Sequence, residues 1–115
     1  YPLLVKLYTA TLKHAGYELE VVTDGKTGLE RVRAGGHGLI LLDVMLPGMD
    51  GLSILKELKS APAIETNGPI LVMTNLTGGA IEQEAMSLGA VECIDKSKLK
   101  SDVLIEKVKR YLLDA

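Results

Sequence analysis

The chain has 115 residues, of which 47% are hydrophobic, so it is long and apolar enough to form one domain with a buried core and is not a disordered chain. Its formal net charge of -2 provides no basic surface for nucleic acid or for an anionic membrane. No apolar run approaches the roughly 18 residues of a membrane span. Cys93 is the only cysteine, which excludes an internal disulfide, and with no signal peptide we expect a cytoplasmic protein.

The first predicted element is a helix over residues 2–15. Pro2 suits the first turn of a helix, where its missing N–H is not needed, and Gly16 is a helix stop signal. Between them, apolar side chains recur at three- and four-residue steps, which predicts an amphipathic helix. The side chains expected to face inward are Leu4, Leu7, Tyr8, Leu12 and Ala15.

A strand and a second helix are predicted next. Residues 18–23, ELEVVT, are typical of a strand with polar interruptions. The turn pair Asp24-Gly25 then leads into a helix over about 26–34, which Gly35-Gly36 ends. Leu29 and Val32 would face the core from this helix.

Two unbroken apolar runs, residues 38–43 (GLILLD) and 69–74 (PILVMT), indicate strands that are covered by helices on both faces. The segment between them contains a third helix, with Asp50 as its expected N-cap. Its inward residues would be Leu52, Leu55 and Leu58.

The remaining chain continues the alternation of helix and strand. A polar, Gly-rich stretch precedes a helix that begins near Ala80 and ends at Leu88-Gly89, and residues 91–95 (VECID) predict a short mixed strand. The last helix, about 101–113, has an apolar stripe made by Leu104, Ile105, Val108 and Leu112. Such alternation predicts an α/β domain with a parallel sheet, in which the two apolar strands are central and the two mixed strands lie nearer the edges.

Three polar residues lie at or just beyond the ends of predicted strands. They are Asp43, Thr74 and Lys96. Because sites in parallel sheets form at the carboxyl ends of the strands, we expect these three side chains to meet in one pocket.

The motifs LLDVMLPGMDG around Asp43, PILVMT ending at Thr74 and GAVECIDK ending at Lys96 resemble the receiver domains of two-component response regulators. This resemblance covers nearly the whole chain and implies a flavodoxin-like fold, a doubly wound parallel sheet with helices on both faces. It implies that Asp43 accepts a phosphoryl group from a histidine kinase or phosphotransfer protein and that Thr74 and Lys96 contact that group. It also implies a Mg²⁺ cofactor bound by Asp43 and by the backbone carbonyl of Met45.

The residue types suit this chemistry. An aspartate side chain is ordinarily ionised at neutral pH, so it attacks phosphorus without a general base. Catalysis of phosphoryl transfer consists mainly of positioning and of neutralising negative charge, which the Lys96 ammonium and the Thr74 hydroxyl would supply. Such a chain would be a phosphoacceptor domain that promotes its own phosphotransfer and dephosphorylation, rather than a conventional enzyme.

Simpler interpretations exist for each residue. Taken alone, Asp43 could end a strand in a turn, Thr74 could be an ordinary β-branched strand residue, and Lys96 could belong to a solvated K-S-K-L-K run. N-capping explains Asp24 and Asp50 fully, so neither is a site candidate. His14 and His37 are too isolated for a metal site, and Cys93 is interpreted as a small buried hydrophobe.

The largest departure from the receiver pattern is at the beginning of the chain. Receivers start with a central strand that ends in an acidic pair, whereas Tyr1 falls at or just after the place of that pair. The domain over residues 1–115 would therefore lack its first central strand, which leaves a gap between 18–23 and 38–43, an incomplete metal site and weak Mg²⁺ binding. We interpret the chain as a fragment, or as one whose strand comes from a partner chain.

Three further positions differ from the family pattern. Ser97 replaces the usual proline after Lys96, and we expect a trans bond there because a cis bond would cost about 3 kcal/mol. Cys93 replaces an aromatic residue, so a switch by ring rotation is lost. Asn75 replaces a small residue, and with Met45 it is expected to alter the lifetime of the acyl phosphate.

The leading functional interpretation is a receiver that switches a protein-interaction face upon phosphorylation. That face would lie within residues 80–113 and bind a second copy or an effector, tested at Glu82, Glu84, Lys107 and Arg110. We expect neither direct nucleic-acid binding nor a membrane partner. The alternative is a pseudo-receiver, a phosphorylation-independent interaction module. A flavin-binding domain is disfavoured because no Gly-rich phosphate loop follows a first strand and tyrosine is the only aromatic residue.

Overall fold

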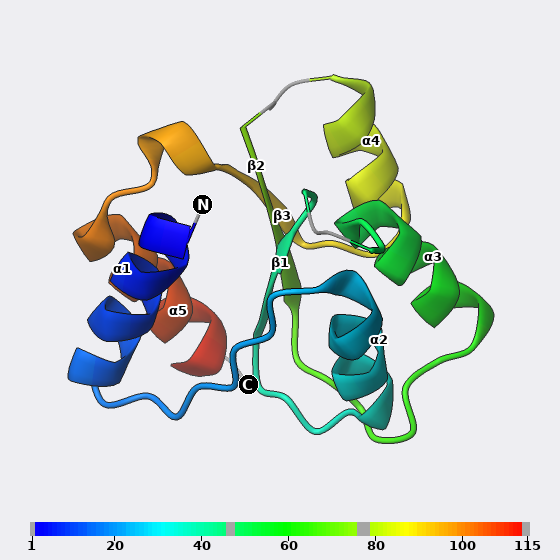
Figure 1. Cartoon of the computed structure of the whole chain (residues 1–115), viewed down its shortest axis with the longest axis horizontal. Coiled ribbons are helices and arrows are strands. Elements are labelled where there is room, and N and C mark those ends of the chain that lie inside the picture. Colours follow the sequence, from blue (N-terminus) through cyan, green and yellow to red (C-terminus); the bar gives the residue numbers. More distant parts are fainter. Residues whose placement is uncertain (1, 46–47, 76–78, 114–115) are drawn as a thin grey trace.

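The computed structural model describes residues 2–45, 48–75 and 79–113, in which helices and strands alternate (Figure 1). The elements are α1 (Pro2–His14), α2 (Gly25–Ala34), β1 (Ile40–Asp43), α3 (Gly51–Ser60), β2 (Ile70–Thr74), α4 (Ala80–Ser87), β3 (Glu92–Asp95), the 3₁₀ turn η1 (Lys96–Lys98) and α5 (Ser101–Leu113). Among these residues, no helix is both long and apolar enough to pass through a bilayer.

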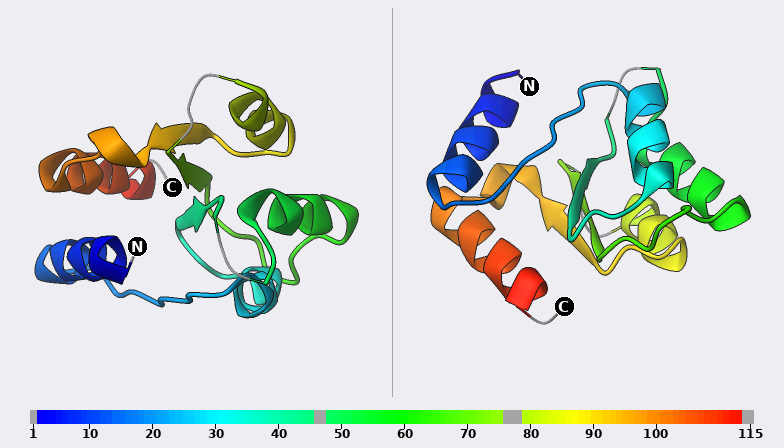
Figure 2. Two further views of the ribbon diagram at one scale, coloured as in Figure 1. Left: turned by 45° about the horizontal axis from the view of Figure 1, so that its top comes forward. Right: turned by 90° about the horizontal axis from the view of Figure 1, so that it is seen from below.

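The sheet is parallel and has the order β1-β2-β3. Helices α1 and α5 cover one of its faces, and α2, α3 and α4 cover the other (Figures 1 and 2). This arrangement confirms the α/β domain with a parallel sheet that the alternating pattern predicted, and it is the doubly wound, flavodoxin-like architecture that the resemblance implied. In the register, Asp43 lies opposite Met73, and Thr74 lies opposite Asp95.

The apolar strands are buried from both sides because their side chains alternate between two core clusters. On β2, Val72 packs with the cluster beneath α2, α3 and α4, whereas Leu71 and Met73 pack with the cluster beneath α1 and α5. Leu71 and Val72 are completely buried. The central strand therefore needs apolar residues at successive positions, which is why PILVMT shows no alternation of polar and apolar residues.

The predicted strand at residues 18–23 is wrong. In the described part of the chain this segment joins no sheet, and β1 consequently lies at the edge of the sheet instead of in its centre. The physical reason is that a strand is stable only through its neighbours, and no neighbouring strand lies beside this segment. Of the residues predicted to face inward from the first helix, Tyr8 and Leu12 are buried, whereas Leu7 (50%) and Ala15 are exposed. The side chain of Leu4 lies outside the described part of the chain.

The predicted N-caps are confirmed. The Asp24 carboxylate accepts a hydrogen bond from the backbone N–H of Thr27 (3.0 Å), and Asp50 accepts one from that of Ser53 (2.8 Å). The hydrogen bond from Thr27 lowers the pKa of Asp24 below its usual value. Both acids are thus engaged in starting helices, α2 and α3 respectively.

A groove of about 1060 Å³ separates residues 17–24 and α1 from the free edge of β1. It extends from Gly36–Gly38 to Asp43 and Lys96, so it reaches the edge of the sheet where the strands end. The sequence had indicated a gap between 18–23 and 38–43, and a groove lies between those segments.

Candidate functional site

Asp43 and Lys96 meet at the carboxyl edge of the sheet. Asp43 is the last residue of β1, and Lys96 directly follows β3, on the far side of β2. The Lys96 ammonium donates a hydrogen bond to Oδ2 of Asp43 and forms an ion pair with it. The lysine side chain is 4% exposed and that of the aspartate is 19% exposed, so the carboxylate is the more accessible member of the pair.

The other carboxylate oxygen is held by the loop that follows β1. The backbone N–H of Met45 donates to Oδ1 of Asp43 at 2.8 Å, while the Met45 side chain is exposed. Val44 is anchored on both sides, because its N–H donates to the carbonyl of Met73 and its carbonyl accepts from Gly51. The carboxylate thus has a fixed orientation before any ligand binds.

Gly51, the first residue of α3, lies against the backbone of Asp43 and Val44. A Cβ at this glycine would lie 2.5 Å from the carbonyl oxygen of Asp43 and 3.0 Å from Cα of Val44, closer than side chains approach backbone atoms. The glycine of the D-G pair therefore allows the first turn of α3 to pack against the strand end that carries Asp43.

Thr74 is the last residue of β2 and is 2% exposed. Since Asp43 lies opposite Met73, Thr74 extends one residue further toward the rim, between the ends of the two neighbouring strands. Lys96 is placed by η1, whose N-cap Asp95 accepts hydrogen bonds from the Ser97 N–H (2.9 Å) and hydroxyl (2.6 Å). The Lys96–Ser97 bond is trans, as predicted.

The possible metal ligands at the carboxyl edge of the sheet suit Mg²⁺ only in part. Among the described residues, no group of three or more His, Cys, Asp or Glu side chains gathers in a metal-binding arrangement. Asp43 supplies one carboxylate, and Mg²⁺ sites commonly use one or two carboxylates with water and phosphate oxygens. The residues present therefore fit a weakly held ion that a phosphoryl group would help to bind.

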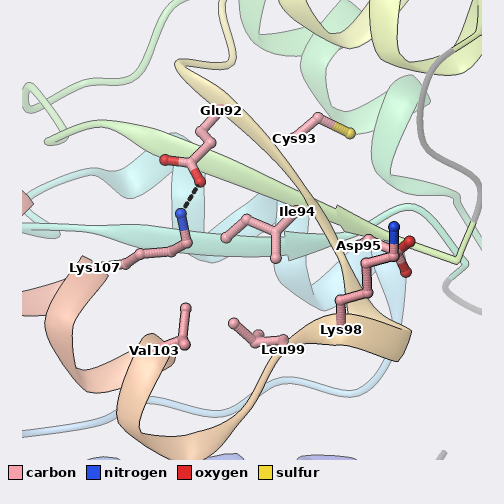
Figure 3. Close-up of a pocket in the computed structure, with 8 residues that line it drawn as sticks. All are labelled: Glu92, Cys93, Ile94, Asp95, Lys98, Leu99, Val103 and Lys107. Carbon is pink, nitrogen blue, oxygen red and sulfur yellow. Dashed lines mark hydrogen bonds and ion pairs between the residues drawn. The ribbon is translucent and has the colours of Figure 1, made fainter.

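A second, smaller pocket of about 240 Å³ lies between β3 and α5 (Figure 3). Cys93, which lines it, is half-buried, so the expectation of a buried cysteine holds only in part. Burial raises the pKa of the Cys93 thiol, and the charge of Glu82 adds to this effect, so the thiol stays protonated.

Glu92 at the same pocket is held by two donors. Lys107 donates to Oε2, and the Tyr111 hydroxyl donates to Oε1 at 2.7 Å (Figure 3 shows the contact with Lys107). Burial alone would raise the pKa of Glu92, but these hydrogen bonds and the Lys107 charge lower it below its usual value.

We expect Glu92→Gln to remove part of the acid sensitivity of folding. Because the folded-state pKa of Glu92 is lowered, its ionised form stabilises the fold above the unfolded value of about 4.3, and this contribution is lost as the pH falls through the lowered pKa. Urea unfolding at decreasing pH should show a shallower loss of stability for the variant. Glu106→Gln on the exposed side of α5 is the control and should match the wild type; equal slopes for all three proteins would contradict the assignment.

The described residues thus form a doubly wound α/β domain in which Asp43 and Lys96 are paired at the carboxyl edge of a parallel sheet. The family model described as the response regulator receiver domain matches residues 1–109, so the chain belongs to the receiver domain family of two-component signal transduction. The transcriptional regulatory protein DltR of Streptococcus agalactiae (strain NEM316) is 35% identical over 100 residues, covering 87% of this chain and 43% of DltR. Hybrid signal transduction histidine kinase B of Dictyostelium discoideum is 30% identical over 94% of this chain, which spans 6% of that kinase.

Solved structures agree with this assignment. The receiver domain of a signal transduction histidine kinase from Syntrophus aciditrophicus superposes with a TM-score of 0.80 and 27% identity, over 100% of this chain and 86% of that one. The receiver of sensor kinase PA1611 from Pseudomonas aeruginosa, solved with a magnesium ion in its active-site cleft, has a TM-score of 0.80 at 22% identity over 97% of this chain and 90% of that one, which shows the shared fold. The curated relatives are more than twice as long as the segment that the chain matches.

Sequence reasoning named the strand-end residues but missed Met45 as an N–H donor, Gly51 and Glu92. The D-G pair after Asp50 was a usable signal for Gly51, since glycine is a poor helix former placed at the first turn of a helix. The contacts of Met45 and Glu92 depend on a loop path and on tertiary packing, for which the local pattern carries no signal.

Proposed function

We propose that Asp43 accepts a phosphoryl group from a phosphohistidine of a histidine kinase or a phosphotransfer protein. The observation that carries this proposal is the pairing of a buried ammonium with a partly exposed carboxylate at the carboxyl edge of the sheet. A purely structural ion pair would not need its acidic member to be the more exposed of the two, at 19% against 4% for Lys96.

In this reaction, one oxygen of Asp43 forms a bond to phosphorus as the bond from phosphorus to the imidazole nitrogen breaks. The electron pair goes to the imidazole, which takes a proton from water. The Met45 N–H and the Lys96 ammonium hold the carboxylate in place for the attack, and Lys96 neutralises charge that develops on the phosphoryl oxygens. Mg²⁺ would supply further neutralisation, held by Asp43, the Met45 carbonyl and the phosphoryl group.

Thr74 would donate its hydroxyl to a phosphoryl oxygen once Asp43 is modified. The support is its place at the end of β2, one residue beyond the partner of Asp43. A pull on Thr74 would displace the start of α4 at Ala80 and so alter the interaction face.

The direct test is intact mass after incubation with Mg²⁺ and acetyl phosphate. We expect the wild type to gain the mass of one phosphoryl group and Asp43→Asn to gain none, because the amide lacks the anionic nucleophile. Asp50→Asn, which retains an N-cap, should be modified like the wild type. An unmodified wild type would favour the phosphorylation-independent pseudo-receiver.

The interaction face is proposed to comprise α4, β3 and α5, for a second copy or an effector. The structure changes which residues best test it, because Lys107 pairs with Glu92 and Glu84 pairs with Lys56 of α3. Exposed apolar side chains on or beside these elements are better probes, because replacing them breaks no ion pair: Met86 (45% exposed), Val91 (45%) and Val103 (36%). Their replacement by serine should weaken partner binding and leave phosphorylation unchanged.

Asn75→Ala is expected to shorten the lifetime of the acyl phosphate several-fold. Asn75 and Met45 are both exposed and follow the ends of β2 and β1, where they would restrict the approach of water to a phosphoryl group on Asp43. The measurement is the rate of phosphate release from the phosphorylated protein, with Gln83→Ala on exposed α4 as the control. Equal rates for Asn75→Ala and wild type would end this hypothesis.

A further inference from the structure

Lys96 meets Asp43 from the far side of the central strand. In the sheet order β1-β2-β3, Asp43 ends β1 and Lys96 follows β3. The lysine side chain is 4% exposed, and its ammonium pairs with Oδ2 of Asp43. Because lysine carries its charge on a long and flexible stem, the place of the ammonium depends on where the backbone of Lys96 is held.

Lys96 lies just beyond the paired part of the sheet. The register between β2 and β3 ends with Thr74 opposite Asp95, one residue before the lysine. The chain then enters η1, where the Leu99 N–H donates to the Lys96 carbonyl at 3.4 Å. Hydrogen bonds in 3₁₀ turns have poorer geometry than those in α-helices, so such a turn gains from further support. The backbone that follows Lys96 therefore depends on what stabilises η1.

Asp95 and Ser97, the two neighbours of Lys96, supply that support. Oδ1 of Asp95 accepts hydrogen bonds from the Ser97 N–H at 2.9 Å and from the Ser97 hydroxyl at 2.6 Å. Figure 3 shows Asp95 where β3 passes into η1. The two bonds enclose Lys96 and hold the trans Lys96–Ser97 bond. A proline at position 97 could make neither bond, because it has no N–H and no hydroxyl.

We propose that Asp95 and Ser97 are positioning residues for the phosphoryl transfer proposed at Asp43, a role that rests on that function. They fix the backbone of Lys96, so that its ammonium meets first the carboxylate and then the phosphoryl oxygens. Since positioning dominates this chemistry, losing the two hydrogen bonds should slow transfer and leave binding of the donor nearly unchanged. The oxygen of Asp95 matters more than its charge, because an asparagine amide oxygen accepts the same bonds.

The test compares two substitutions at position 95 in the rate of phosphorylation by acetyl phosphate with Mg²⁺. Asp95→Ala should lower the maximal rate by at least about tenfold and change the half-saturating acetyl phosphate concentration by less than about twofold. Asp95→Asn should stay close to the wild type, because it retains the acceptor. An unchanged rate in Asp95→Ala, or an equal loss in both variants, would overturn the positioning role.

Two further variants test the hydroxyl and the specificity of the effect. Ser97→Ala keeps the N–H bond and loses the hydroxyl bond, so it should slow transfer by less than Asp95→Ala does. Asp102→Ala is the matched control, since Asp102 also accepts a backbone N–H, from Val103 at 3.0 Å, but does not flank Lys96. It should be phosphorylated at the wild-type rate. A loss in Asp102→Ala as large as in Asp95→Ala would show a general effect on the segment and contradict the role.

Nuclear magnetic resonance provides a readout that needs no phosphoryl donor. Asp95→Ala should speed hydrogen exchange at the Ser97 amide by at least about tenfold and remove the ammonium signal of Lys96, which is identified by its absence in Lys96→Met. Asp95→Asn should retain both. If these effects appear but the wild type takes no phosphoryl group, the function of Asp43 fails, and Asp95 and Ser97 still orient Lys96. If the wild type is phosphorylated and Asp95→Ala keeps the Lys96 signal, the positioning role fails alone.

Discussion

Asp43→Ala is expected to destabilise the fold by about 3 kcal/mol in addition to abolishing phosphorylation. The substitution removes the carboxylate that pairs with the Lys96 ammonium, whose side chain is 4% exposed, and removing one partner of a buried ion pair destabilises the fold. Because Asp43 is partly exposed, the expected loss of stability lies at the lower end of the range for buried pairs. Urea unfolding, with the slope on denaturant checked for constancy, measures the loss.

Two variants make this result specific. Asp24→Asn removes another carboxylate but retains an N-cap, so its stability should stay close to that of the wild type. Adding Lys96→Met to Asp43→Ala should recover much of the lost stability, because no charge is then left buried. If Asp43→Ala alone is as stable as the wild type, the pair does not contribute as described.

Gly51→Ala is expected to cost about 3 kcal/mol and to slow phosphorylation of Asp43. The added Cβ would lie 2.5 Å from the carbonyl oxygen of Asp43, and this contact is relieved only by moving backbone, either the start of α3 or the end of β1. Overpacking of this kind typically destabilises by about 1–3 kcal/mol, and a clash with backbone lies at the upper end. Either displacement would misplace the carboxylate relative to Lys96, which reduces the rate because positioning dominates this chemistry.

Gly28→Ala is the matched control for Gly51→Ala. Gly28 lies inside α2, and a Cβ there would make only ordinary contacts, 3.8 Å from Cδ1 of Ile54 and 3.9 Å from Cγ1 of Val22. Since alanine is the better helix former, this variant should be more stable by about 0.5–1 kcal/mol and should be phosphorylated normally. If both variants lost stability, or both gained it, the contact between residue 51 and the backbone of Asp43 would not explain the effect of Gly51→Ala.

Much of the fold was predictable because its elements carry local signals. Apolar runs identified β1 and β2, helical periodicity identified α2 to α5, and the capping acids Asp24 and Asp50 marked where two helices begin. The pairing of Lys96 with Asp43 followed from a general property of parallel sheets, whose strand ends gather at one edge. The predicted meeting therefore needed no knowledge of the loops.

The predictions that failed concern features that depend on tertiary contacts rather than on local sequence. Residues 18–23 have the composition of a strand, but pairing requires a neighbour, and none of the described residues supplies one. Leu7 was predicted to face inward from α1, yet it is 50% exposed, whereas Tyr8 and Leu12 pack in the core cluster beneath α1 and α5. The hydrogen bond from Met45 to Asp43 depends on the path of the loop after β1, which no periodicity encodes.

The central claim, that Asp43 is the phosphoacceptor, is tested most directly by locating the modified side chain. Borohydride reduction converts an aspartyl phosphate to homoserine, which fragment mass spectrometry can assign to one position after treatment with Mg²⁺ and acetyl phosphate. We predict homoserine at position 43 and at no other aspartate. Homoserine at Asp24, Asp50 or Asp95, or none at all in a protein whose mass shows phosphorylation, would contradict the assignment.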